Sequence, residues 1–298
     1  MVTEQNSKID PTLGTVLKLL RKSKGLTIKE AAGNSFSCPH LSNFENGKTE
    51  FSARFLLEEL KNINVSITEF QAFYDNYIHS KEYNLISNSE ITDAYMSHNL
   101  AKLHVILKEL DSKHNNNRNI KKYHLEVVRI KSLISIIDPI FKVPLDDIKM
   151  LKDYLIKLNE WGKYDIELLG QCCLIFDLGT ISILTQNMLN PGQTTIKIEG
   201  NKHALIQTSI NIINLFISKK QFNLARNLIN HLETNDIHEY YMYEKLTLIY
   251  NTASYNYHKG DKYALETMKK CQQIFEFCQC FKTANLVAEE ISSLLKTQ

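Results

Sequence analysis

Apolar residues recur with helical spacing along most of the chain. The first stripe, at positions i, i+3, i+4 and i+7, consists of Leu13, Val16, Leu17 and Leu20. This spacing places the four side chains on one face of an α-helix. Shorter apolar patterns, separated by residues that start or end helices, follow up to about residue 80. The first seventy residues therefore predict a compact group of short helices.

Polar residues that precede these patterns are suited to helix starts. Thr27 with Glu30, and Ser66 with Glu69, have the spacing of a capping box, in which the two residues satisfy each other's backbone amides. Ser37 can cap a third helix in the same way. The pattern thus predicts a very short second helix after Thr27, followed closely by a third after Ser37.

Beyond residue 80 the predicted helices become long and their connections short. The helical runs are 92–111, 119–137, 145–160, 164–189, 202–218, 222–234, 238–258, 262–277 and 281–296. Consecutive helices with brief connections pack antiparallel, which predicts a stack of helical hairpins. A degenerate repeat, an aromatic residue near the start of a second helix, is clearest at Phe222 and partial at Tyr123, Tyr164 and Tyr263. An irregular α-bundle is the alternative.

Composition and net charge exclude some fold classes and some classes of function. The 298 residues include only 10 Gly and 5 Pro, too few for the many tight turns of a β-sandwich or barrel. A net charge of +2 gives no field over the whole chain that would attract nucleic acid or a membrane. We expect a cytoplasmic protein without a membrane span, whose 6 cysteines are mostly buried, inert thiols. A regulatory disulfide is the alternative for the cysteines.

No pattern in the sequence predicts catalysis. The segment Gly47 to Thr49 resembles the end of a phosphate-binding loop, but Ser42 stands where that loop requires glycine. The cysteines and histidines lack the spacings typical of zinc ligands. We therefore expect neither an enzyme nor a bound metal or cofactor, and an enzyme with a helical core is the least favoured hypothesis.

The N-terminal pattern has the physical parts of a DNA-binding helix-turn-helix. Between residues 10 and 48, six basic residues stand against three acidic ones, a local charge of +3 that the whole-chain value hides. The basic first helix can cross the DNA backbone. The third helix, which begins with small polar residues, can enter the major groove. A small helical interaction module is the alternative interpretation.

Residues 13–70 resemble the helix-turn-helix of XRE-type repressors, most specifically in the run LSNFENGK from Leu41 to Lys48. Together with the segments 158–166 and 257–261, this makes the chain similar to the Rgg family of regulators from Gram-positive bacteria. The resemblance implies a helix-turn-helix followed by a tetratricopeptide-like domain that dimerises and binds a short signalling peptide.

The predicted fold class is therefore all-α. An N-terminal helix-turn-helix domain is followed by a right-handed superhelical stack of tetratricopeptide-like helical hairpins. We predict a DNA-binding domain over 1–70, a linker over 71–88 and a repeat domain for peptide sensing and dimerisation over 89–298.

The resemblance also implies which residues contact DNA. The base-facing positions are Ser37, Cys38, Pro39, His40 and Asn43, and the candidate phosphate contacts are Arg21, Lys22, Lys24, Lys29 and Lys48. Arg21 and Glu45 match a pair that bridges the first and third helices, and for them the structural role is preferred to DNA contact. The chain departs from the family at Pro39, which donates no hydrogen bond, and at Asn43, which suits adenine rather than guanine.

The peptide is expected on the first helix of each hairpin, over 146–160, 203–218 and 238–258, because these helices line the concave face of such a stack. The candidate residues are Asn211, Asn214, Asn251 and Tyr255. An asparagine amide both donates and accepts hydrogen bonds, as a peptide group requires.

The sequence thus predicts a homodimeric transcriptional regulator in the cytoplasm. Its partners would be double-stranded DNA with a pseudo-palindromic operator and a short intracellular pheromone peptide. A helical-repeat protein-interaction scaffold with a degenerate helix-turn-helix is the second hypothesis.

Overall fold

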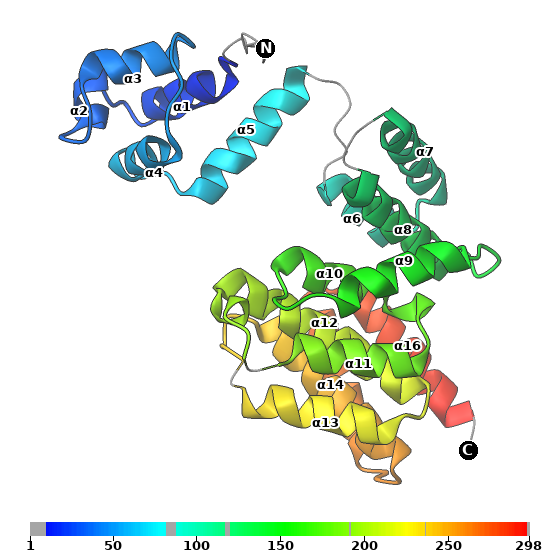
Figure 1. Ribbon diagram of the computed structural model, residues 1–298. Coiled ribbons are helices and arrows are strands. Elements are labelled where there is room, and N and C mark those ends of the chain that lie inside the picture. Colours follow the sequence, from blue (N-terminus) through cyan, green and yellow to red (C-terminus); the bar gives the residue numbers. More distant parts are fainter. Residues whose placement is uncertain (1–9, 82–87, 117–119, 191, 236, 297–298) are drawn as a thin grey trace. The chain divides into compact units, whose positions relative to one another are not determined.

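The computed structural model describes residues 10–81, 88–116, 120–190, 192–235 and 237–296, and within them every regular element is a helix. The all-α prediction is confirmed. The chain forms two compact units, Met1–Ser87 and Asn88–Gln298, coloured blue to cyan and green to red in Figure 1. Over the described ranges, no helix is both long and apolar enough to cross a membrane.

The first unit contains five helices in its described part: α1 (Thr12–Ser23), α2 (Ile28–Ala32), α3 (Cys38–Glu45), α4 (Ala53–Asn62) and α5 (Ile67–Lys81). The apolar stripe of α1 packs into one core with Leu41 and Phe44 of α3 and Phe70 of α5. Helix α5 begins before residue 70, continues to Lys81 and contacts α1, so it crosses the predicted end of the DNA-binding domain.

Local chemistry explains why these helices begin where they do. Both predicted capping boxes are present. The amide of Glu30 donates to Thr27 Oγ1 at 3.2 Å while the amide of Thr27 donates to Glu30 Oε2 at 2.7 Å, and Ser66 with Glu69 repeats the arrangement. Gly14 allows α1 to approach α3, since a Cβ at this position would lie 2.0 Å from the carbonyl oxygen of Phe44.

The helices of the second unit that the structure describes are α6 (Asn88–Met96), α7 (Leu100–Asn116), α8 (Ile120–Ile137), α9 (Leu145–Ile156), α10 (Lys163–Cys172), α11 (Leu178–Met188), α12 (Glu199–Ser218), α13 (Phe222–Thr234), α14 (Met242–His258), α15 (Ala264–Phe277) and α16 (Phe281–Lys296). Two short 3₁₀ turns, η1 (Cys173–Ile175) and η2 (Thr195–Lys197), complete the set.

Two predicted helices are in fact pairs. The run 92–111 is broken between α6 and α7, where His98 has a φ of 51°. The run 164–189 is broken before α11, where Asp177 Oδ1 accepts a hydrogen bond from the amide of Thr180 at 2.9 Å. The apolar periodicity continues through both breaks, so hydrophobic spacing alone did not indicate them.

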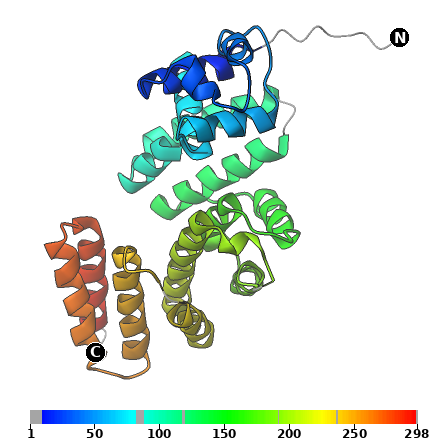
Figure 2. The ribbon, with the colours of Figure 1, turned by 90° about the vertical axis from the view of Figure 1, so that its left-hand side faces the viewer.

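Alternate helices of the second unit contact one another in succession. Helix α8 packs on α10, α10 on α12, and α12 on α14, and we call these four helices the central row. The row can be followed from green to orange in Figure 2. Helix α9 instead contacts α8 and α11, so it lies outside the central row. The prediction that residues 146–160 line the same face as α12 and α14 is therefore wrong.

The three helix contacts of the central row share one feature. In each, a small, buried polar side chain donates a hydrogen bond to a backbone carbonyl of the neighbouring helix. The bonds run from Ser132 to Gln171, from Thr208 to Ile166 and from Asn251 to Ile210, at 3.0, 3.0 and 3.1 Å. We call them the row bonds. Their donors are at most 3% exposed, so each bond replaces water at a helix contact that would otherwise hold an unpaired polar group.

The aromatic repeat proved only half right. Phe222 begins α13, and Tyr263 immediately precedes α15; both helices follow a helix of the central row, as the repeat predicts. Tyr123 and Tyr164, by contrast, lie on α8 and α10 in the central row itself. An aromatic residue of this pattern therefore indicates that a helix begins nearby. It does not indicate whether that helix is the first or the second of a hairpin.

Candidate functional sites

Helix α3 presents its first residues to solvent. Ser37 caps it as predicted, its Oγ accepting from the amide of His40 at 3.4 Å, and Cys38 and Pro39 are exposed. Asn43 is half-buried one turn further along. This start of α3 is thus free to approach a partner, while its other face is occupied by the core residues Leu41 and Phe44.

An aromatic cluster supports α3 from behind. Its rings belong to Phe36, His40, Phe44, Phe51 and Phe55, with Phe44 and Phe51 stacked at 4.0 Å. The ring of His40 lies 4.9 Å from that of Phe51 and 5.1 Å from that of Phe55. The structure therefore gives His40 a packing role that the sequence did not predict. The only signal was the density of aromatic residues on both sides of α3.

Arg21 and Glu45 form the predicted pair between the first and third helices. Arg21 Nε lies 2.6 Å from Glu45 Oε1 and Nη2 lies 2.8 Å from Oε2, while Nη1 donates to the carbonyl of Leu26 at 2.6 Å. The hydrogen bond to Glu45 raises the pKa of Arg21 against the opposing effect of burial. Because the side chain of Arg21 is only 6% exposed and its fork is occupied, the expectation that it contacts a phosphate is not supported.

A second carboxyl lies deeper beside this pair. Glu59 of α4 is fully buried, and neither of its oxygens has a hydrogen-bond partner in the part of the chain that the structure describes. Burial, reinforced by the charge of Glu45 and only partly offset by Arg21, raises the pKa of Glu59 to about 7. No signal in the sequence indicated this burial, since Glu59 sits among the ordinary charged positions of an amphipathic helix.

The remaining basic candidates are accessible. Lys22, Lys24, Lys29 and Lys48 are all exposed. Exposed ammonium groups near a helix that can enter a groove are suited to phosphate contacts, which position a protein on DNA without reading its sequence.

The four predicted peptide-binding residues differ in how far they are exposed to solvent. Asn251 is 3% exposed, and its amide forms one of the row bonds, so the prediction that it binds a ligand is wrong. Tyr255 is half-buried, with its ring 6.1 Å from that of Phe222 and the Arg226 guanidinium 5.8 Å from its centre. Asn211 and Asn214 are exposed on α12.

The two exposed asparagines belong to a longer polar stripe. Gln207, Asn211, Asn214 and Ser218 are all exposed, and their spacing of four, three and four residues places them on one face of α12. We call them the amide stripe. Next to it, Glu244 Oε1 accepts from His203 Nε2 and Gln207 Nε2, each at 2.9 Å. Burial alone would raise the pKa of Glu244, but these two bonds hold it below its usual range.

The cysteines offer no reactive centre within the second unit's core. Burial raises the pKa of Cys172 to about 12 and that of Cys173 to about 11, so both remain protonated thiols at neutral pH. All six cysteines of the chain are free.

Comparison with known proteins connects this architecture to a family. Residues 106–289 match the model of the C-terminal domain of the HTH-type transcriptional regulator Rgg. The chain is 26% identical to the SHP pheromone receptor Rgg2 of Streptococcus dysgalactiae, covering 94% of this chain and 99% of the receptor with a TM-score of 0.75.

Two more distant structures share the fold. A candidate transcriptional regulator from Listeria monocytogenes EGD-e is 16% identical, with 96% and 98% of the two chains covered and a TM-score of 0.77. PrgX in its complex with cCF10 is 15% identical, with 96% and 93% covered and a TM-score of 0.68. The helical fold described above is therefore shared with both of these chains along nearly their whole length.

Proposed function

Because the chain belongs to the Rgg family of helix-turn-helix transcriptional regulators, we propose that it acts in the cytoplasm as a homodimer that binds DNA and a short signalling peptide. The family consists of regulators and not of enzymes. We assign DNA binding to residues 1–70, the connection to 71–88, and sensing with dimerisation to 89–298. A two-fold dimer would read a pseudo-palindromic operator in double-stranded DNA.

The observation that carries the DNA-binding proposal is that α3 is held firmly at its end and along one face while its start is exposed. The Arg21–Glu45 pair fixes its end to α1, and the aromatic cluster supports it from behind, while Cys38 and Pro39 at its start remain exposed. In this arrangement Asn43 is the side chain suited to reading a base, and an adenine is its natural partner. The exposed lysines supply phosphate contacts, so affinity should depend strongly on salt.

Fluorescence anisotropy on duplexes from the region upstream of the gene, between 50 and 200 mM salt, tests this proposal. Each phosphate contact contributes a slope of about 0.9 in log K against log salt. The variant Lys22→Gln/Lys24→Gln should therefore lower the slope by about 1.8, whereas Lys61→Gln, at the exposed end of α4, should leave it unchanged. Binding that is absent, or insensitive to salt, would favour the protein-interaction scaffold instead.

The peptide-sensing proposal rests on the amide stripe. Rgg2 is a pheromone receptor and PrgX was solved with cCF10, and the exposed amides of Asn211 and Asn214 can pair with the backbone of an extended peptide. Mass spectrometry of the protein purified from its own cells should detect a bound peptide. The variant Asn211→Ala/Asn214→Ala should lose it, and Asn230→Ala, on the exposed surface of α13, should retain it.

A further inference from the structure

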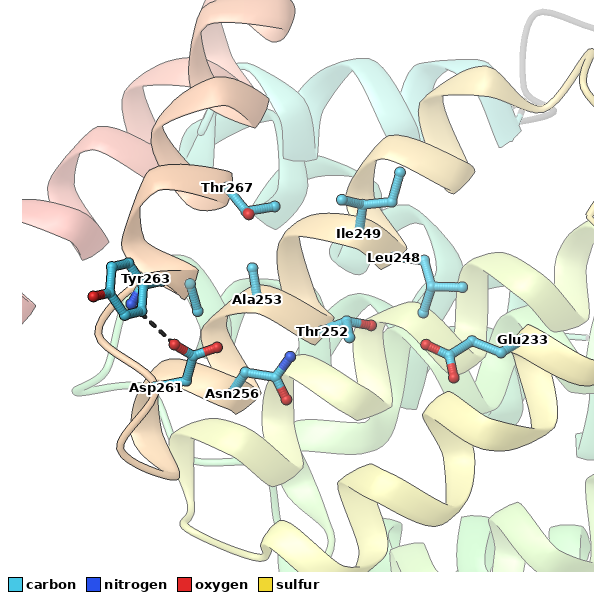
Figure 3. Close-up of a pocket in the computed structure, with 10 residues that line it drawn as sticks. Glu233, Leu248, Ile249, Thr252, Ala253, Asn256, Asp261, Tyr263 and Thr267 are labelled. Carbon is cyan, nitrogen blue, oxygen red and sulfur yellow. Dashed lines mark hydrogen bonds between the residues drawn. The ribbon is translucent and has the colours of Figure 1, made fainter.

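A separate pocket lies between α13, α14 and α15, with a volume of about 360 Å³. Figure 3 shows its lining side chains. On α14 it is lined by Ile249, Thr252 and Asn256, whose spacing of three and four residues puts them on one face of the helix. Asn251, which faces α12, lies on another face. The pocket is thus distinct from the amide stripe, and its volume falls within the range typical of ligand sites.

Two carboxylates dominate the charge of this pocket. Figure 3 shows those of Glu233 and Asp261 extending from opposite sides toward Thr252 and Asn256. Lysine and arginine are missing from the set of lining residues. Glu233 also lies in the last turn of α13, where the carbonyl end of the helix adds partial negative charge. The pocket therefore has a negative potential without a cation of its own to balance it.

Both carboxylates retain hydrogen-bonding capacity. One oxygen of Asp261 accepts from the amide of Tyr263 at 3.0 Å. Within the described ranges, neither the other Asp261 oxygen nor the Glu233 carboxylate is used by a hydrogen bond or ion pair. The hydroxyl of Thr252 is shielded from solvent and likewise has no described partner. A buried polar group in this state costs free energy until it is paired.

The rest of the lining is apolar. Leu248, Ala253 and Ala264 are buried and border the pocket, and Ile249 adds an exposed aliphatic surface. A ligand suited to this lining needs a cationic head for the carboxylates and an aliphatic stem for the apolar wall. A bare metal ion does not fit, because no group of three acidic, histidine or cysteine side chains among the described residues could hold one.

We propose that this pocket binds an aliphatic ammonium group, carried either by a free diamine or by a lysine side chain of a peptide. The ammonium lies in the negative potential of Glu233 and Asp261, and the methylene stem packs on Leu248 and Ile249. The site goes beyond the DNA and peptide functions proposed above, because none of its residues belongs to α3 or to the amide stripe.

Saturation-transfer NMR on the full-length protein tests the site with cadaverine, N-acetyl-lysine methylamide and n-pentanol as probes. At least one of the two amines should bind at least 10-fold more tightly than n-pentanol, which has the stem without the charge. Whichever amine binds more tightly identifies the source of the ammonium. The variants Glu233→Gln and Asp261→Asn should each weaken binding of that amine about 5- to 10-fold.

A matched control is Glu289→Gln, an exposed carboxylate on α16, which should leave amine binding unchanged. The emission of Trp161, the one tryptophan of the chain and fully buried, confirms that each variant is folded. Equal affinity for n-pentanol, or an unchanged affinity in folded Glu233→Gln, would overturn the proposal. So would displacement of the amine by CaCl₂ but not by NaCl at equal ionic strength, since that marks a metal-ion site.

Discussion

Arg21 holds Glu45, the last residue of α3, through two hydrogen bonds made by different nitrogens of its guanidinium. A planar fork that meets a carboxylate in this way fixes direction as well as distance. The end of α3 is therefore oriented on α1, and the orientation of its exposed start follows from it. The pair thus sets the direction in which α3 presents its start, while its own side chains stay buried.

Removal of one partner of this pair should be more damaging than removal of both. Arg21→Met leaves the Glu45 carboxylate buried and uncompensated, a change that costs about 3–5 kcal/mol in comparable pairs. Arg21→Met/Glu45→Leu replaces the pair with apolar side chains and should recover most of the loss. Hydrogen exchange of α1 and α3 measures both variants. A double variant as unstable as the single one would contradict this account.

Gly14 and Gly200 should respond oppositely to alanine, although both lie in helices. At Gly14 the added Cβ meets the carbonyl of Phe44, and backbone cannot move aside cheaply, so α1 and α3 must separate. At Gly200 nothing lies within 4 Å of the added atom, and Gly200→Ala should stabilise the protein by up to about 1 kcal/mol through helix propensity. Thermal unfolding followed by circular dichroism distinguishes the two variants.

The row bond of Asn251 predicts a stability effect and not a binding effect. Asn251→Ala removes the donor to Ile210 and leaves a small void, which should cost about 2–3 kcal/mol. Asn211→Ala, on the exposed face of α12, should change stability by less than about 0.5 kcal/mol. Urea unfolding monitored by Trp161 fluorescence compares them. Equal destabilisation by both variants would show that the row bond contributes nothing.

Glu59 should make the first unit less stable as the pH rises. Its pKa in the folded chain is raised to about 7 from an ordinary value of 4.5, so folding favours the protonated form. The contribution of Glu59 to stability is full below about pH 4.5 and is lost as the pH rises to about 7, a decrease of about 3 kcal/mol. Hydrogen exchange of α1 and α4 at pH 5 and pH 8 measures the change. Glu59→Gln should remove this part of the pH dependence. If the stability of that variant decreases by the same amount between pH 5 and pH 8, Glu59 is not the cause.

The features that local chemistry determines could be predicted from the sequence. The stripe of α1, the two capping boxes and the Ser37 cap depend on residues a few positions apart, and each occurs as expected. The breaks at His98 and Asp177 were missed because the apolar periodicity continues across them. A short polar residue at a cap has the same appearance in sequence as one on a helix surface.

For the candidate site residues, too, the features that depend on contacts between distant helices could not be predicted. Asn211, Asn214 and Asn251 are the same residue type on neighbouring helices, yet two are exposed and one is buried. The difference depends on which helix packs beside α12, and that contact joins residues about forty positions apart. The packing of His40 and the burial of Glu59 could not be predicted for the same reason. The rings against His40 come from α4 and the loop before it, and the charges beside Glu59 come from α1 and α3.

The row bonds have a mechanical consequence. A side chain that donates to a main-chain oxygen of the next helix fixes the two helices against sliding along their axes, because a shift of one turn would detach it. The helices from α8 to α14 should therefore move together as one rigid group. At the end of the row the corresponding link, Ser254 to the Glu290 carboxylate at 2.9 Å, joins two side chains instead. Side chains can follow a moving partner, so bending of the second unit should concentrate at α16.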